Sequence, residues 1–415
     1  MRQLVPAFAF FLVLWAFFGT NNVLELRAEE PRRAIVALEM VLQDQWTVPT
    51  IHGEPYYNKP PVFNWVLASF YRLTGSTNEW VTRLPGLLSL LLLAGAHYLF
   101  TRKYLGETIA RWSAVFLLCT GDLLFYGAVN SGEIDLFYAL VSYLQVACIF
   151  HFFHRRQWWL LYLGSYALMT VGLLTKGLSS LPLQGFTLLA LLLYHRQWKA
   201  LFAPAHFVGL GLSFGLLLLY FQQYANLNDP WPYLTNLVNE ASHKTGAETP
   251  LLETVQHLVS FPLQVLQVLL PWSLLLVLFF RKGTGKTLWQ NDWLRYSVLF
   301  LAANLWLYWL SPGTKNRYLY LFFPFLLSLF TWMWLTFRER APQLVKWANH
   351  GLTVALGIGV LVLLALPWAG GDELIRQHTA LLWCLPVFGV LALVLHLQWK
   401  DWRPASLVIF LFLFR

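Results

Sequence analysis

Residues 83–101 read RLPGLLSLLLLAGAHYLFT, and this run decides the class of the protein. Between Arg83 and Arg102 it contains no Asp, Glu, Lys or Arg. A helix of about 20 apolar residues is long enough to cross the hydrocarbon core of a membrane. Runs of about 16 to 20 apolar residues recur along the whole chain, which is typical of a polytopic helical membrane protein.

The composition excludes a soluble globular domain. Hydrophobic residues make up 58% of the chain and charged residues 12%, whereas a soluble domain has about 25% charged residues. We therefore predict an all-α polytopic membrane protein with about 13 transmembrane helices. The expected spans are 4–20, 83–101, 110–128, 134–153, 158–174, 178–194, 203–222, 262–280, 294–310, 318–336, 351–368, 379–397 and a last one that starts near residue 404.

Charge predicts the orientation of the spans. Only Arg2 precedes the first apolar run, and no small-residue cleavage site follows Gly19, so we expect a retained anchor rather than a removed signal peptide. With the N-terminus inside, the inner connections hold most of the Lys and Arg residues, as the positive-inside rule requires. The formal net charge of +9 therefore indicates topology, and we expect no nucleic-acid partner.

In this topology the two long loops, 21–82 and 223–261, lie outside. Long loops in compact proteins usually carry function, so we expect a working face on the outer side of a single transmembrane domain that spans residues 1–415. In a bacterial inner membrane this side would be the periplasm.

The first outer loop is predicted to be helical. Pro31 suits the first turn of a helix, with Glu29 and Glu30 where acids favour a helix N-terminus. Apolar residues then recur at helical spacing, which predicts a helix in the plane of the interface. A stretch rich in Pro and Gly follows, and then a second short amphipathic helix. The apolar positions of the two helices are Ile35, Leu38, Val41 and Leu42, and then Phe63, Val66, Leu67 and Phe70.

A series of short motifs, in this order and spacing, resembles one family. They are Glu29-Glu-Pro-Arg32, Trp46-Thr-Val-Pro49, Gly53-Glu-Pro-Tyr56, Lys59-Pro-Pro61, Arg83-Leu-Pro85, Glu133-Ile-Asp-Leu136, Leu174-Thr-Lys-Gly177, Pro271-Trp272 and Lys315-Asn-Arg-Tyr318 with Pro324. The chain resembles the lipid-linked-sugar glycosyltransferases of the membrane-embedded type C fold (GT-C), in particular the aminoarabinose transferase and protein O-mannosyltransferase group. The resemblance covers about residues 20–330. The C-terminal extramembrane domain usual in that family is expected to be absent, and the short last run suggests a truncated chain.

The resemblance implies an enzyme that moves a hexosyl or pentosyl group from a polyprenyl-phosphate donor to a lipid (lipid A-like), protein or glycan acceptor. The leaving group is a lipid phosphate, so cations must stabilise the charge that grows on it in the transition state. A hydroxyl acceptor also needs a carboxylate as general base. Both types of residue occur on the predicted outer face.

Two acids are the candidate catalytic residues. Glu29 aligns with an acid of the family that is normally Asp, and Glu133 fits the spacing of a second family acid before Leu136. Glu30 is a secondary candidate that we expect to pair with Arg33 or Arg83. Asp135 is another, placed on a different side of the helix from Glu133. The alternative is that Glu29 only serves the helix dipole and that Glu133 only begins a helix at the interface.

The candidate donor-binding residues share the outer face and positive charge or hydrogen-bonding capacity. They are Lys59, Arg83, Lys176, Lys315, Arg317 and Tyr318, with Arg33 and Tyr56 as secondary candidates. The alternative is that outer Lys and Arg side chains merely reach lipid phosphates. We expect no metal requirement, because no compact acidic triad is visible and these cations can cover the phosphate.

Two other classes of protein remain open. A transporter or flippase would favour ionisable groups at mid-membrane depth, whereas here they cluster at the outer surface apart from Asp122. A non-catalytic polyprenyl-lipid-binding protein is the second alternative. The segment Gly283-Thr-Gly-Lys-Thr287 echoes the end of a nucleotide-binding loop, but a membrane span precedes it instead of a strand.

Overall fold

The computed structural model describes residues 15–19, 25–127, 131–244, 250–338, 342–365, 379–398 and 403–413. The first outer loop holds α2 (Glu30–Leu42), β1 (Thr50–Ile51), β2 (Glu54–Pro55) and α3 (Val62–Thr74). The bundle then contains α4 (Glu79–Leu105), α5 (Glu107–Leu118), the π-helix η1 (Asp122–Gly127), α6 (Asp135–His154), α7 (Trp158–Lys176), α8 (Ser180–Tyr194), η2 (Trp198–Phe202) and α9 (Pro204–Ala225). It continues with α10 (Trp231–Lys244), α11 (Leu251–Val268), η3 (Trp272–Phe280), α12 (Thr284–Trp289), α13 (Asp292–Trp309), η4 (Asn316–Phe322), α14 (Phe323–Phe337), α15 (Pro342–Ala365), α17 (Thr379–Gln398) and α18 (Arg403–Leu413).

The protein is a polytopic helical membrane protein, as predicted. Within the described ranges, six helical segments are long and apolar enough to cross a membrane. They are Glu79–Leu105, Asp135–His154, Trp158–Lys176, Pro204–Ala225, Asn316–Phe337 and Pro342–Ala365. The expected total of about 13 spans stays a prediction, and most of the first span, 4–20, together with Arg2, lies outside the described residues.

Two predicted spans are interrupted. The run 262–280 is not one straight helix, because α11 ends at Val268 and η3 leaves it at an angle of 114°. Pro271 lies between them, and proline cannot continue a helix without loss of a backbone hydrogen bond. The run 110–128 is divided into α5 and η1. Hydropathy identifies these apolar segments but is insensitive to a change of direction within them.

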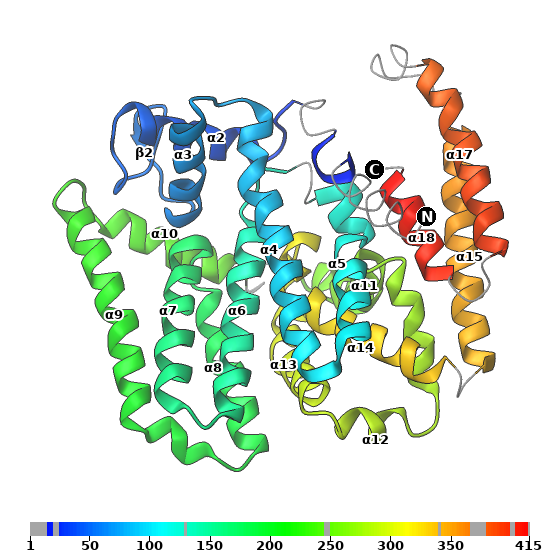
Figure 1. Cartoon of the computed structure of the whole chain (residues 1–415). Coiled ribbons are helices and arrows are strands. Elements are labelled where there is room, and N and C mark those ends of the chain that lie inside the picture. Colours follow the sequence, from blue (N-terminus) through cyan, green and yellow to red (C-terminus); the bar gives the residue numbers. More distant parts are fainter. Residues whose placement is uncertain are drawn as a thin grey trace.

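The two predicted interfacial helices, α2 and α3, are confirmed as helices. Pro31 lies in the first turn of α2, and the buried faces of the two helices pack together through Val36, Met40, Leu67 and Tyr71. The Glu39 carboxylate accepts a hydrogen bond from Thr50 Oγ1 at 2.5 Å, which fastens the small hairpin to α2. The loop is therefore a compact unit at one end of the bundle (Figure 1).

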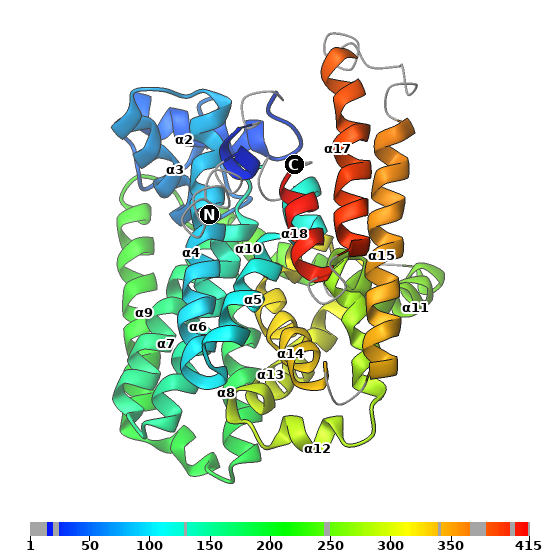
Figure 2. The ribbon, with the colours of Figure 1, turned by 45° about the vertical axis from the view of Figure 1, so that its right-hand side comes forward.

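The helices form a bundle with distinct ends. Figure 1 shows α2, α3 and the hairpin at the top, α10 directly beneath them, and α12 at the opposite end. Figure 2 shows α15, α17 and α18 standing together at one side. The core is largely aromatic and aliphatic, and it includes a stack of Phe116 on Trp272 with ring centroids 3.7 Å apart. A charged cavity lies where the first outer loop meets the bundle.

Candidate functional site

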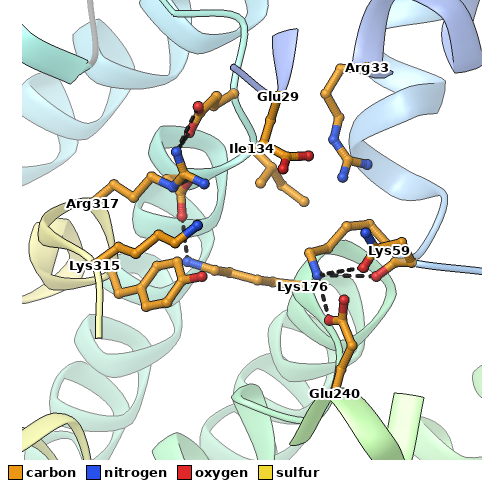
Figure 3. Close-up of a pocket in the computed structure, with 12 residues that line it drawn as sticks. Glu29, Arg33, Lys59, Ile134, Lys176, Glu240, Lys315 and Arg317 are labelled. Carbon is orange, nitrogen blue, oxygen red and sulfur yellow. Dashed lines mark hydrogen bonds and ion pairs between the residues drawn. The ribbon is translucent and has the colours of Figure 1, made fainter. Parts of the chain in front are cut away.

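A central cavity of about 190 Å³ brings together five parts of the chain: the first outer loop, the start of α6, the end of α7, α10 and η4 (Figure 3). Its lining residues are Glu29, Arg33, Asn58, Lys59, Glu133, Ile134, Asp135, Lys176, Glu240, Lys315, Arg317 and Tyr318. Five cations and four carboxylates thus meet in one small space. Both predicted catalytic acids and four of the five principal predicted cations are among them.

Glu29 lies immediately before α2 and faces the cavity (Figure 3). Its side chain makes no capping hydrogen bond to the helix. Instead, its carboxylate accepts a hydrogen bond from Arg32 Nη1 at 2.8 Å. About a third of the side chain is exposed (34%), so Glu29 is accessible to a ligand in the cavity.

Glu133 and Asp135 both lie against Arg317. Arg317 Nη1 is 2.5 Å from Glu133 Oε2, and Arg317 Nε is 3.3 Å from Asp135 Oδ2. The expectation that the two acids lie on different sides of one helix is therefore wrong. Asp135 is the first residue of α6, whereas Glu133 precedes the helix, so helical spacing does not apply to the pair.

Burial has an electrostatic consequence for Glu133, which lies outside the spanning helices. Burial raises the pKa of Glu133 to about 7, although Arg317 opposes this rise and the charge of Asp135 adds to it. Glu133 therefore titrates near neutrality. A carboxyl group that changes its charge near the working pH is common at functional sites.

Lys176 is surrounded by partners. Its ammonium group donates a hydrogen bond to Asp135 and lies over two aromatic rings, 4.2 Å from the centroid of Tyr318 and 5.0 Å from that of Tyr138. The side chain is 7% exposed. Since its charge is already neutralised by Asp135, we infer that Lys176 mainly positions Asp135 and Tyr318.

Two other lysines differ in their pairing. Lys59 forms an ion pair with Glu240 of α10 and also donates a hydrogen bond to the Asn58 carbonyl. Lys315 lies on the opposite side of the cavity in Figure 3. In the part of the chain that the structure describes, no carboxylate pairs with the Lys315 ammonium. Lys315 is also exposed, so its ammonium group is accessible to an incoming anion.

Arg33 is a further cation of the cavity. Its side chain is 2% exposed, and its Nη2 donates a hydrogen bond to Tyr56 Oη at 2.8 Å. Its Nη1 has no hydrogen-bond partner among the described residues, and Figure 3 shows the guanidinium turned toward the cavity. Tyr56 itself lies behind Arg33 and supports it.

Arg83 and Glu30 lie outside the cavity. They form a fully buried ion pair, with 2.9 Å between Arg83 Nε and Glu30 Oε1, as expected for Glu30. Glu30 also accepts a hydrogen bond from the Gly132 amide, and a Cβ at Gly132 would lie 2.9 Å from the Thr82 carbonyl oxygen. The ion pair and the hydrogen bond from Gly132 together fix the backbone beside Glu133. Arg83 thus lies outside the central cavity and is buried against Glu30, and its predicted role as a phosphate ligand stays a prediction.

Two further cavities adjoin the central one. The first, of about 400 Å³, shares Lys176, Glu240 and Tyr318 with it and is otherwise lined largely by apolar side chains of α8, α10 and α13; we call it the apolar cavity. The second, of about 530 Å³, shares Glu133, Lys315 and Arg317 and also contains Asp122; we call it the polar side cavity. The charged centre therefore has one apolar and one polar neighbour.

Sequence reasoning missed Glu240. It lies 181 residues from Lys59 along the chain, and no short motif surrounds it. The only available signal was its place in the second outer loop, which was expected to lie on the same face. Among the described residues, no group of three or more His, Cys, Asp and Glu side chains is arranged to hold a metal ion.

Residues 58–221 match the family described as dolichyl-phosphate-mannose-protein mannosyltransferase. The chain is 29% identical over 202 residues to undecaprenyl phosphate-α-4-amino-4-deoxy-L-arabinose arabinosyl transferase 1 of Sodalis glossinidius. It is 30% identical over 203 residues to the corresponding transferase of Erwinia tasmaniensis. Each match covers 46% of this chain but only 35% of the relative's length.

The fold is similar to that of solved structures over almost the whole chain. ArnT from Cupriavidus metallidurans bound to undecaprenyl phosphate matches with a TM-score of 0.73 and 19% identity, covering 99% of this chain and 75% of that protein. The apo state of the same protein matches with a TM-score of 0.67 and 20% identity, at the same coverage. The predicted GT-C resemblance is confirmed, and the chain has the fold of these structures.

Proposed function

We propose that this chain is a glycosyltransferase that moves a sugar from a polyprenyl-phosphate donor to a lipid, protein or glycan acceptor. One observation carries the proposal. The central cavity holds two candidate acids, Glu29 and Glu133, beside Lys59, Lys315 and Arg317, and it adjoins an apolar cavity. A ligand with an anionic head and an apolar chain matches this combination.

The reaction forms one bond and breaks another at the anomeric carbon of the sugar. An acceptor oxygen attacks this carbon, and the bond between the carbon and the phosphate oxygen breaks. The polyprenyl phosphate leaves with the bonding electron pair. If the acceptor is a hydroxyl, its proton passes to a carboxylate, for which Glu29 is the candidate. If the acceptor is a phosphate, no base is required.

The cations of the cavity stabilise the departing phosphate. Charge on the leaving oxygen grows in the transition state, and fixed cations in a partly buried site stabilise that charge more strongly than water does. Lys315 is one candidate for this role, because it is exposed and has no carboxylate partner within the described residues, and Arg33, whose Nη1 has no hydrogen-bond partner there, is another. The guanidinium of Arg317 presents several N–H donors in one plane, but its Nη1 and Nε already contact the carboxylates of Glu133 and Asp135.

The apolar cavity suits the lipid chain. Its lining includes Leu178, Leu181, Leu237 and Leu307, and burial of a polyprenyl chain against such side chains is favourable. Because this cavity shares Tyr318 with the central one, a single ligand can occupy both. The polar side cavity, on the other side of Arg317, is our candidate entry for the acceptor.

The test uses the purified full chain and a synthetic polyprenyl-phosphate sugar. Release of polyprenyl phosphate together with transfer to an acceptor supports the proposal. Binding of the donor without transfer, unaffected by alanine at Glu29, would favour a non-catalytic lipid-binding protein. Movement of the intact donor between leaflets of a vesicle would favour a flippase.

We also propose that transfer needs no metal, since Lys59, Lys315 and Arg317 can cover the phosphate. Full activity after treatment with a chelator supports this, and a loss that a divalent ion reverses would contradict it. Placement in a bacterial inner membrane with the cavity toward the periplasm, and a total of about 13 spans, belong to the same proposal. Labelling of single cysteines in the loops of intact cells tests them.

The sugar and the acceptor can be identified by comparing a deletion strain with its parent. Mass spectrometry of envelope lipids and glycoproteins from a deletion strain should reveal a missing sugar on one acceptor. Its mass distinguishes a pentose from a hexose. An unchanged envelope in a strain that normally expresses the chain would contradict the proposal.

A further inference from the structure

The structure contains an ion pair that links the two outer loops across the cavity. Lys59 of the first loop pairs with Glu240 of α10 in the second loop, and Figure 3 shows the two side chains meeting at the cavity. Both are mostly buried, with 18% and 24% of the side chain exposed. The Glu240 carboxylate therefore neutralises the ammonium group of Lys59, which the proposed function assigns to binding of the donor phosphate.

Glu240 also lies at the boundary between the central cavity and the apolar cavity. It is one of three residues that line both the central cavity and the apolar cavity. A polyprenyl phosphate has its anionic head joined directly to its apolar chain, so a ligand in the two cavities places its phosphate near this boundary. Two anions so close together repel each other strongly in a partly buried site.

The helix that carries Glu240 is held by other contacts. Asn236 Nδ2 donates a hydrogen bond to the Tyr57 carbonyl at 2.9 Å, and the rings of Tyr57 and Tyr233 lie 6.2 Å apart. Tyr233 is 1% exposed and packs against Tyr224. The position of α10 therefore does not depend on the ion pair alone, and a neutral side chain at residue 240 should leave the helix in place.

We infer that Glu240 is an internal competitor for the lipid phosphate and promotes release of the polyprenyl phosphate product. This inference rests on the proposed function. When the phosphate occupies Lys59, the Glu240 carboxylate is displaced from its partner, and when the phosphate leaves, the carboxylate returns. Lys59 is thus never left without a counter-charge.

The effect should be larger for the product than for the donor. The donor is a phosphodiester with one negative charge. The product is a phosphomonoester, which carries about −1.5 to −2 at neutral pH. Repulsion from Glu240 therefore weakens the binding of the product more than that of the donor. This difference favours turnover, because the product must leave before the next donor enters.

The test compares Glu240→Gln with the unaltered full chain in detergent, with a polyprenyl monophosphate as the probe. Glutamine keeps the size of the side chain and removes its charge. We expect the dissociation constant of the monophosphate to fall roughly threefold to tenfold, as for the loss of one partly exposed charge. Steady-state turnover should fall, because product inhibition is stronger.

A matched control is Glu253→Gln, an exposed residue of α11 outside the three cavities; it should leave binding unchanged. A second comparison places Glu240→Gln in a Lys59→Ala background, where the gain in affinity should be clearly smaller, because competition for Lys59 is lost and only direct repulsion remains. Unchanged or weaker binding by Glu240→Gln, or a gain of the same size without Lys59, would overturn the inference. An unaltered chain that does not bind the monophosphate at all would overturn the proposed function as well, so the two failures are distinguishable.

Discussion

The guanidinium of Arg317 pairs with the carboxylate of Glu133, with 2.5 Å between Nη1 and Oε2. This contact joins η4 to the segment before α6, and both residues line the central cavity and the polar side cavity. The charge on Glu133 therefore controls how much positive charge Arg317 presents to a ligand. Since burial raises the pKa of Glu133 to about 7, this control operates near neutral pH.

Binding of the donor should depend on pH through Glu133. The pKa is raised from its ordinary value of 4.5, so protonation occurs as the pH falls through about 7, and the cavity then loses one negative charge. We expect the donor to bind more tightly at pH 6 than at pH 8. The donor is a phosphodiester and does not titrate in this range, so the change belongs to the protein.

The measurement is a titration of the donor at several pH values for the unaltered chain and for Glu133→Gln. The variant resembles the protonated form, so its affinity should be nearly constant across the range. A variant that keeps the full pH dependence would show that another group is responsible.

Lys315 and Lys176 should respond differently to alanine. Lys315 has no carboxylate partner in the described ranges, so its removal should leave the thermal unfolding temperature nearly unchanged. Turnover should fall on the order of 10² to 10³ if Lys315 meets developing charge. Lys176→Ala removes one of the positive charges that compensate the buried Asp135 carboxylate. This variant should therefore lower the thermal unfolding temperature, unlike Lys315→Ala. The control is Lys286→Ala, at the end of the bundle opposite the first outer loop, which should change neither quantity. Parental turnover in a folded Lys315→Ala chain would remove Lys315 from the site.

The sequence predicted the positions of helices better than it predicted which charged side chains pair with each other. The start of α2, with Pro31 in its first turn, depends on residues only a few positions apart, so a local pattern reveals it. The predicted apolar positions Ile35, Leu38, Val41 and Leu42 are not its buried face, because α2 packs on α3 through Val36, Ala37 and Met40 instead.

Lys176 and Lys315 look equivalent in the sequence, because both are outer lysines near an apolar run. Only tertiary contacts place one beside Asp135 and leave the other available to a ligand. The ion pair of Lys59 with Glu240 left no local pattern at all.

The pair of Arg83 and Glu30 should behave as a structural element. Both side chains are fully buried, so Arg83→Ala leaves an uncompensated carboxylate in the interior and should cost about 3 to 5 kcal/mol of stability. The double variant Arg83→Met with Glu30→Gln removes both charges and should recover part of that stability. Thermal unfolding in one detergent measures both. If Arg83→Ala unfolds like the unaltered chain but fails to bind the donor, Arg83 is a ligand residue after all.

Glu29 tests the chemistry of the acceptor. If Glu29 is the base for a hydroxyl, Glu29→Gln keeps the shape of the side chain and removes the proton acceptor, so transfer should nearly vanish while donor binding persists. Glu29→Asp shortens the side chain by one methylene, and a displacement of about 1 Å can cost about a hundredfold in rate. The assay is a single-turnover transfer measurement. Normal rates in both Glu29→Gln and Glu29→Ala would leave only a role at the start of the helix.

Asp122 should act on transfer through η4. Its carboxylate accepts a hydrogen bond from Tyr320 Oη at 2.7 Å and another from Asn316 Nδ2 at 3.3 Å. Gln264 Nε2 of α11 donates to the other side of the Asn316 amide at 2.8 Å. These contacts hold both flanks of the turn that presents Arg317, so Asp122 is a positioning residue rather than a ligand of the phosphate.

Asp122→Ala should therefore lower the rate of transfer by about ten- to a hundredfold, because a small displacement of Arg317 misaligns the charge that stabilises the leaving group. Asp122→Asn can still accept from Tyr320 and should recover much of the rate. In an Arg317→Ala background, Asp122→Ala should add little, because residues that act through one another are not additive. Ser113→Ala removes a buried contact with His97 outside the cavity; it should change stability without changing transfer. Equal losses from Asp122→Ala with and without Arg317 would show that Asp122 acts independently of it.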